Sequence, residues 1–205
     1  MNYLALGDSI SIDTYTGVPG GGAASQFARL VGATQFQDLT RDGRTTEGVL
    51  EAWGEITVRP DVVTLTAGGN DFLQGAWRAL NTPSGWREVS AQPLANMEDI
   101  ADRLGVFGCP VIVNTVYDPT GGDDALLGAF GMAPAIAKEA RAAFNAINDG
   151  IRALAKQKGF LLADLGALFH GRGVASPDPW IVSQIEPNLA GATAIARHWH
   201  DLYHP

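Results

Sequence analysis

Three short segments of the chain carry residue types suited to acyl-transfer chemistry. Gly7-Asp8-Ser9 places a hydroxyl after an apolar run, Gly43 lies in a polar turn, and Gly68-Gly69-Asn70 presents a side-chain amide. A serine hydroxyl can attack a carbonyl carbon, and nearby N–H groups stabilise the oxyanion that forms. Each segment alone is equally typical of a helix cap or a plain turn. Together they predict a nucleophile at Ser9, with oxyanion donors from the backbone of Ser9 and Gly43 and from the Asn70 side chain.

The elements that must position these segments can be predicted from apolar patterning. Five short apolar runs indicate buried strands: Tyr3–Leu6, Gln35–Leu39, Val62–Thr66, Val111–Thr115 and Phe160–Ala163. Helical periodicity falls mainly between them, at Ala24–Val31, Thr46–Glu55, Ser84–Phe107, Pro134–Lys158 and Leu189–Tyr203. The longest remaining stretches, Tyr117–Met132 and His170–Pro187, are expected to be loops.

This alternation of strands and helices predicts an α/β fold. We expect a three-layer α/β/α sandwich, flavodoxin-like, around a parallel sheet of about five strands. Ligand sites in such sheets lie beyond the carboxyl ends of the strands. Ser9, Gly43 and Asn70 each follow a predicted strand. We therefore expect them to share one crevice.

Length, charge and composition restrict the class of protein. The 205 residues suit a single domain over residues 1–205. The net charge of -8 makes nucleic acid and anionic membranes poor partners. No apolar run approaches the ~20 residues of a spanning helix, and no leader-like segment precedes Asn2, so a cytoplasmic protein is expected. The single cysteine and the four histidines show no metal-ligand spacing, and we expect no metal and no cofactor. The sequence leaves the oligomeric state open.

The order and spacing of these segments resemble the SGNH, or GDSL-type, hydrolase family over nearly the whole chain. Gly-Asp-Ser at Ser9 is similar to the family's first block, Gly43 to its second, and Gly-x-Asn-Asp at Asn70 to its third. Glu186-Pro187-Asn188, before the last predicted helix, resembles the closing block. The resemblance implies the SGNH fold and hydrolysis of small-molecule carboxylic esters through an acyl-enzyme on Ser9.

The closing block departs from the family pattern. Where the pattern places the histidine base the chain has Glu186, and where it places the orienting aspartate the chain has Ser183. One alternative is that Glu186 takes the serine proton itself, with burial raising a carboxyl pKa that is otherwise about 2 units below that of imidazole. A second is that His170 folds back to Ser9 and is oriented by Glu186. A third is a ligand-binding protein that has lost hydrolase activity.

Overall fold

The computed structural model describes residues 1–79, 85–130 and 136–204, without the side chains of 128–130. Its centre is a five-stranded sheet in the order β2-β1-β3-β4-β5, with every neighbouring pair parallel. The strands are β1 (Asn2–Gly7), β2 (Gln35–Thr40), β3 (Val62–Thr66), β4 (Val111–Asn114) and β5 (Leu161–Ala163). All five predicted strands are confirmed, and none of their ends moves by more than one residue.

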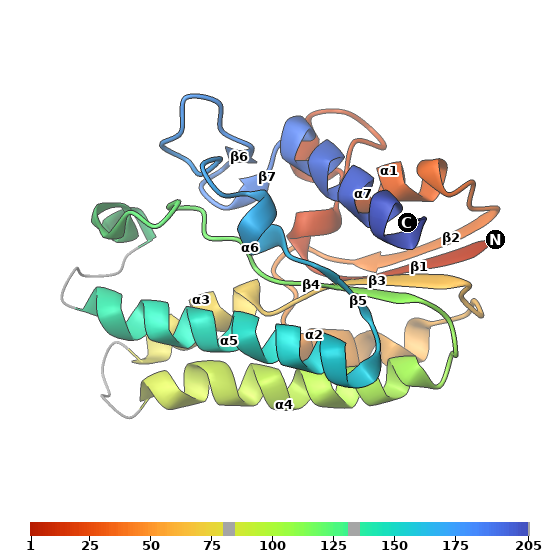
Figure 1. The fold of residues 1–205 in the computed structure, drawn as a ribbon, viewed down its shortest axis with the longest axis horizontal. Helices are drawn as coiled ribbons and strands as arrows, with labels where there is room; N and C mark the ends of the chain where they lie inside the picture. The colour runs from red at the N-terminus through yellow and green to blue at the C-terminus, as the bar shows by residue number, and fades with distance from the viewer. Residues whose placement is uncertain (80–84, 131–135, 205) are drawn as a thin grey trace.

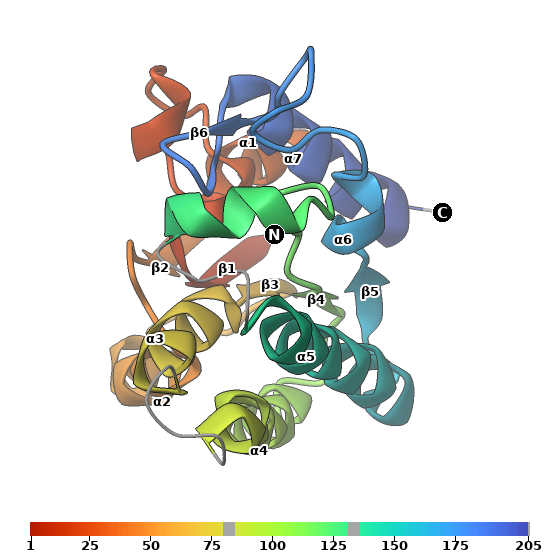
Figure 2. The same cartoon turned by 90° about the vertical axis from the view of Figure 1, so that its left-hand side faces the viewer.

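Helices cover both faces of the sheet (Figures 1 and 2). α1 (Ala23–Leu30) and α7 (Leu189–Tyr203) pack on one face, and α2 (Thr46–Glu51), α4 (Gly85–Gly105) and α5 (Ala137–Lys158) on the other. Alternate residues of a strand point to opposite faces. Accordingly, Tyr3 lies in the core under α1 and α7, whereas Leu4 lies in the core under the other helices. The predicted three-layer α/β/α sandwich is confirmed.

Several helical ends differ from the prediction. The segment after β3, for which a turn and a helix cap were both open and no helix was predicted, begins α3 (Gly69–Ala79). The predicted helix 46–55 divides into α2 and a 3₁₀ segment, η3 (Ala52–Glu55). The helix expected from Ser84 ends earlier, at Gly105, and the one expected from Pro134 begins at Ala137 among the described residues. Ser84 and Pro134 themselves lie outside the described residues.

The two predicted loops contain short elements. η4 (Asp124–Phe130) lies in the first, and a two-stranded hairpin, β6 (Ile181–Val182) with β7 (Glu186–Pro187), lies in the second. The hairpin turns through Ser183 and Gln184, whose φ values of 50° and 73° are in the left-handed region. Glycine or asparagine usually signals such a turn, so this turn could not be predicted from its residue types. The hairpin lies beyond the carboxyl ends of the strands (Figure 1), and its strand β7 contains Glu186.

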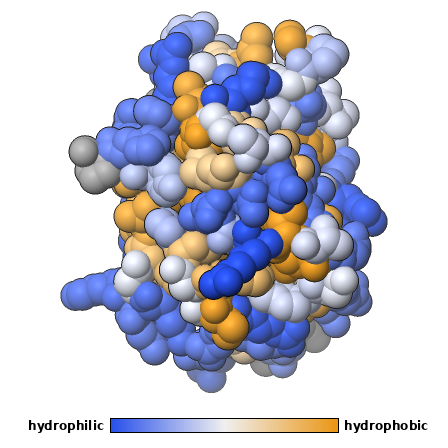
Figure 3. Space-filling model, turned by 90° about the vertical axis from the view of Figure 1, so that its right-hand side faces the viewer, coloured by the Kyte–Doolittle hydropathy of each residue, from blue (hydrophilic) through white to orange (hydrophobic). Residues whose placement is uncertain are grey.

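Both chain termini lie on the opposite side of the molecule, N at the start of β1 and C at the end of α7 (Figure 1). Figure 3 shows this face, on which apolar side chains form several small groups separated by hydrophilic ones. Such scattered exposure is ordinary for a folded protein. Within the described residues, no helix combines the length and the apolar character needed to cross a membrane.

Candidate active site

Ser9 is held by a tight turn at the end of β1. Gly7 has φ +128°, and a Cβ at this position would lie 1.9 Å from the carbonyl oxygen of Thr66. Only glycine therefore allows this close approach of β1 to β3. Asp8 then caps a single 3₁₀ turn, η1 (Ser9–Ser11), because its Oδ1 accepts the Ile10 N–H at 3.1 Å. Ser9 thus begins a helical turn, as expected, and only 4% of it is exposed.

Glu186 lies directly against Ser9. The Ser9 hydroxyl donates to Glu186 Oε1 at 3.1 Å, and Glu186 is 5% exposed. Its second oxygen, Oε2, is buried and has no hydrogen-bond partner among the described residues. Burial raises the pKa of Glu186, the Ser9 hydroxyl lowers it in part, and the charge of nearby Asp42 raises it again. The structure therefore pairs the hydroxyl with a carboxylate that binds protons more readily than an exposed one.

Asn70 reaches the same region from the first turn of α3. Its Nδ2 donates to the carbonyl oxygen of Arg44 at 3.1 Å. The neighbouring Asp71 accepts from the N–H and the hydroxyl of Thr46, at 2.9 and 2.6 Å. These bonds tie the start of α3 to the turn before α2, which holds Gly43 with φ +71°. The second and third blocks are therefore joined by direct hydrogen bonds.

One cavity, here called the Ser9 cavity, is lined by Ser9, Asn70 and Glu186. Gly43 does not line it, but lies in a neighbouring depression with Arg41 and Arg44. The remaining wall of the Ser9 cavity is largely apolar and includes Phe72, Leu73, Val116, Leu127, Phe144 and Ile185. The expected shared crevice is therefore present for Ser9 and Asn70 but not for Gly43, and Glu186 lines it as well.

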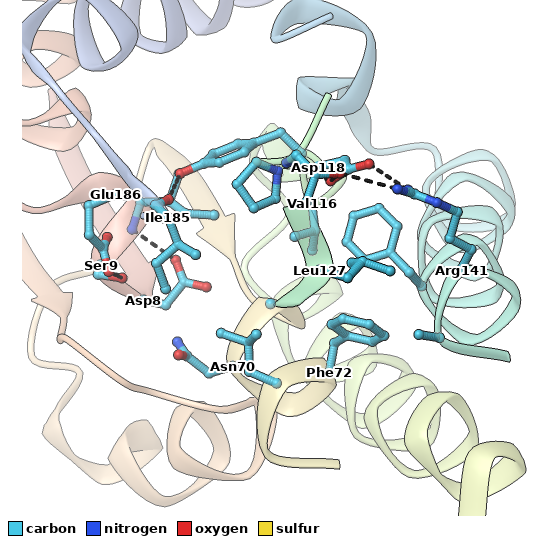
Figure 4. A pocket seen from close by; sticks show the side chains of 18 residues that line it. Asp8, Ser9, Asn70, Phe72, Val116, Asp118, Leu127, Arg141, Ile185 and Glu186 are labelled. Atoms are coloured by element: carbon cyan, nitrogen blue, oxygen red, sulfur yellow. Dashed lines mark hydrogen bonds and ion pairs between the residues drawn. The ribbon is translucent and has the colours of Figure 1, made fainter. Parts of the chain in front are cut away.

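The two ends of the cavity differ in charge (Figure 4). At the end away from Ser9, Arg141 pairs with Asp118 at 2.7 Å and with Asp124, and it donates to Thr120. Burial acts to raise the pKa of Asp118, but hydrogen bonds from Thr120 and Arg141 hold it below its usual range. The charge of Arg141 is therefore neutralised by Asp118 and Asp124, at the end of the cavity away from Ser9.

His170 does not meet Ser9 in the structure. It is exposed, it lies just after the short helix α6 (Leu165–Leu168), and it does not line the Ser9 cavity. Its backbone N–H donates to the Ala167 carbonyl at 3.2 Å. Because Glu186 Oε2 has no partner among the described residues, no Glu186–His170 hydrogen bond is present there. The arrangement in which Glu186 orients His170 is thus absent from this geometry.

Two residues of the cavity were not singled out from the sequence. Asp8 is 1% exposed and lines the cavity beside Ser9. Burial raises its pKa to about 7; the Ile10 N–H and the Thr66 hydroxyl oppose the rise, and the charges of Glu186 and Asp71 add to it. Tyr117 donates its hydroxyl to the Ile185 carbonyl, next to Glu186. The only signal for Asp8 was its place beside Ser9, and Tyr117 had no signal beyond its position in a long loop.

Across residues 1–79, 85–130 and 136–204, no three His, Cys, Asp or Glu side chains gather in a way that could hold a metal ion.

The model of the GDSL-like Lipase/Acylhydrolase family matches residues 5–194. The chain belongs to this family. No curated protein matches it. In this GDSL-family chain, the residue that accepts the hydrogen bond of Ser9 is the carboxylate of Glu186.

Solved structures agree with the family fold. An α/β hydrolase from the metagenome of Lake Arreo, Spain, is 20% identical, with a TM-score of 0.70 over 99% of this chain and 94% of that one. Phospholipase A1 from Streptomyces albidoflavus is 21% identical, with a TM-score of 0.69 over 99% and 98%. An acetylxylan esterase from Geobacillus stearothermophilus is 17% identical, with a TM-score of 0.68 over 98% and 93%. At these identities the likeness shows the GDSL-family fold alone.

Proposed function

We propose that the chain is a serine esterase that hydrolyses small-molecule carboxylic esters through an acyl-enzyme on Ser9, with Glu186 as the direct base. The observation that carries the proposal is the hydrogen bond of 3.1 Å between two buried groups, Ser9 Oγ and Glu186 Oε1, in a cavity that Asn70 also lines. A general base must lie within hydrogen-bond reach of the proton that it removes. Family membership supports acyl hydrolysis as the reaction class.

The first half of the reaction forms the acyl-enzyme. Ser9 Oγ attacks the ester carbonyl carbon, its proton passes to Glu186 Oε1, and the carbonyl electron pair moves onto oxygen. The side chain of Asn70 and the backbone N–H of Ser9 stabilise this oxyanion, whereas Gly43, a donor expected from the sequence, lies outside the cavity lining. When the intermediate collapses, the C–O bond to the alcohol breaks and the leaving oxygen takes the proton from Glu186.

The second half regenerates the enzyme. Water attacks the acyl carbon and gives a proton to Glu186, and the second intermediate releases the acid as Ser9 recovers that proton. In both halves Glu186 is neutral when the oxyanion is present, so Glu186 and the oxyanion are never negatively charged at the same time. The raised pKa of Glu186 narrows the gap between a carboxylate base and an imidazole. The apolar wall that includes Phe72 and Phe144 is suited to the acyl chain.

Short p-nitrophenyl esters and a fluorophosphonate probe test this function. Ser9→Ala should reduce turnover by at least about 10³-fold and abolish labelling. Ser11→Ala is the matched control, because Ser11 lies on the same turn and bonds to Thr66 at 3.0 Å. It should retain both turnover and labelling.

Two results would contradict the proposal. The first is unchanged turnover in Ser9→Ala. The second is saturable binding of a small ligand by a wild-type protein that neither turns over esters nor becomes labelled, which is the behaviour of a non-catalytic binding protein.

A further inference from the structure

A second carboxyl group lines the Ser9 cavity and has no part in the reaction described so far. Asp8 is the cap of η1, but a cap needs only one oxygen, and Oδ1 fills that role by accepting the Ile10 N–H at 3.1 Å. Capping residues commonly face solvent, whereas Asp8 is 1% exposed. In Figure 4 its carboxyl group points into the cavity, on the side of Ser9 that faces Asn70. In the proposed reaction the carbonyl oxygen of the ester lies on this side, where Asn70 can donate to it.

The charged groups around Asp8 favour its neutral form. Glu186 and Asp71 are the carboxylates that act on it, and the Thr66 hydroxyl is its neutral neighbour. Arg141 is the arginine that lines this cavity, and it is paired with Asp118 and Asp124 at the other end. Two carboxyl groups in one buried cavity do not both ionise readily when no cation faces them. Burial and the charge of Glu186 raise the pKa of Asp8, whereas the Ser9 hydroxyl lowers that of Glu186 in part, so we expect Asp8 to be the group of this pair that keeps a proton.

We propose that Asp8 is a further catalytic residue, whose protonated carboxyl group donates a hydrogen bond to the developing oxyanion beside Asn70. This role rests on the proposed esterase function. The proton stays on Asp8 throughout, so the transfers between Ser9, Glu186 and the leaving alcohol are unchanged. A neutral carboxylic acid in an apolar site is a strong donor of this kind. Asp8 would supply a donor within the cavity, whereas Gly43 lies outside the cavity lining.

The role of Asp8 predicts a particular pH profile. Activity should rise as Glu186 ionises and fall as Asp8 loses its proton, because an ionised Asp8 repels the oxyanion instead of binding it. Burial raises the pKa of Asp8 to about 7, which places the alkaline limb near neutral pH. The groups that face the pair are Tyr15 and Asp42 on the side of Glu186, Asp71 on the side of Asp8, and Tyr117, which interacts with both carboxyl groups.

The test compares the pH dependence of kcat/KM for p-nitrophenyl butyrate in two variants at position 8. Asp8→Asn keeps an acceptor for the Ile10 N–H and an N–H donor for the oxyanion, but it does not titrate. We expect it to stay within about tenfold of wild type at the optimum and to lose the alkaline limb. Asp8→Ala removes the donor and should lose on the order of 10²-fold at every pH below the limb. Thermal unfolding checks that each variant folds.

The matched control is Asp164→Asn. Asp164 also caps a short helix, α6, through its side chain, but it lies outside the Ser9 cavity. Its pH profile should match that of wild type.

An alkaline limb that persists in Asp8→Asn, or that also disappears in Asp164→Asn, would overturn the role of Asp8 while leaving the esterase intact. An Asp8→Ala variant that folds and keeps wild-type activity would also overturn the role of Asp8 and leave the esterase function intact. A wild-type protein without turnover and without labelling of Ser9 would refute the esterase function and this role together.

Discussion

At the two ends of the Ser9 cavity, the pKa values of the carboxyl groups are shifted in opposite directions. At one end, Asp118 receives Arg141 and the Thr120 hydroxyl, and its pKa is lowered. At the other, the hydrogen bonds that Asp8 and Glu186 accept from the described residues come from neutral N–H or O–H groups, and burial raises the pKa of each. A buried carboxylate that serves structure is normally paired with a cation. The unpaired end, which holds Ser9, is therefore the end whose protonation can change during a reaction.

The largest expected effect comes from removing the base. Glu186→Gln keeps the shape of the side chain but cannot accept the Ser9 proton, so kcat/KM for p-nitrophenyl esters should fall on the order of 10³-fold. Asp118→Asn is the control at the other end of the same cavity and should remain within a few-fold of wild type. If the two variants lose activity equally, the ends of the cavity do not differ in the way their charges indicate.

The second effect concerns stability, and the two ends should respond to pH with opposite signs. The pKa of Asp8 rises from 3.8 to about 7 on folding, so wild-type stability falls as pH rises through this range. Asp8→Asn removes that loss, and relative to wild type it should gain up to about 4 kcal/mol between pH ~4 and pH ~8.

For Asp118 the pKa is lowered on folding, so its ion pair stabilises the protein at neutral pH and the benefit fades as the carboxylate is protonated. Asp118→Asn should therefore lose about 1–3 kcal/mol near pH 7 and less in acid. Urea denaturation of both variants at several pH values measures these differences. Parallel pH dependence of the two variants would contradict the comparison.

The third effect distinguishes an amide that donates to the oxyanion, Asn70, from an amide that only stabilises the fold, Asn96. Asn70→Ala should reduce kcat on the order of 10²-fold, because it removes an oxyanion donor. Asn96 is the matched amide: its Nδ2 donates to the Thr46 hydroxyl at 2.9 Å, in the network that holds α2 and α3 together, and it lies outside the cavity. Asn96→Ala should lower the denaturation midpoint while kcat stays near wild type. Equal kcat values for the two variants would argue against the role of Asn70.

Much of the framework could be predicted from the sequence because its signals are local. The buried strands are runs such as Val62–Thr66, and the positions of Ser9 and Asn70 follow from the ends of β1 and β3. Long-range features had no local signal. The pairing of Arg141 with Asp118 joins α5 to a loop 23 positions away, and the turn at Ser183 and Gln184 uses residues that seldom adopt positive φ.

The site residues Glu186 and Asp8 also depend on long-range contacts that have no local signal in the sequence. Glu186 could be named from its place before the last helix, but its contact with Ser9 spans 177 positions and depends on the hairpin. Asp8 could not be recognised as a cavity residue, because an aspartate at the start of a helical turn is typical of a solvated cap. Its burial follows from the packing around it. The single-domain organisation over residues 1–205 stays a prediction.

The smallest expected effect distinguishes the two possible bases. His170→Ala should change kcat/KM by less than about twofold, because the side chain is exposed and lies outside the Ser9 cavity. A histidine base would instead make His170→Ala as damaging as Glu186→Gln, since members of one proton relay fail together. The double variant sharpens the test: adding His170→Ala to Glu186→Gln should reduce the residual rate no further. A large loss in the single variant would mean that the loop after α6 folds over Ser9 during turnover, and that Glu186 acts through the imidazole.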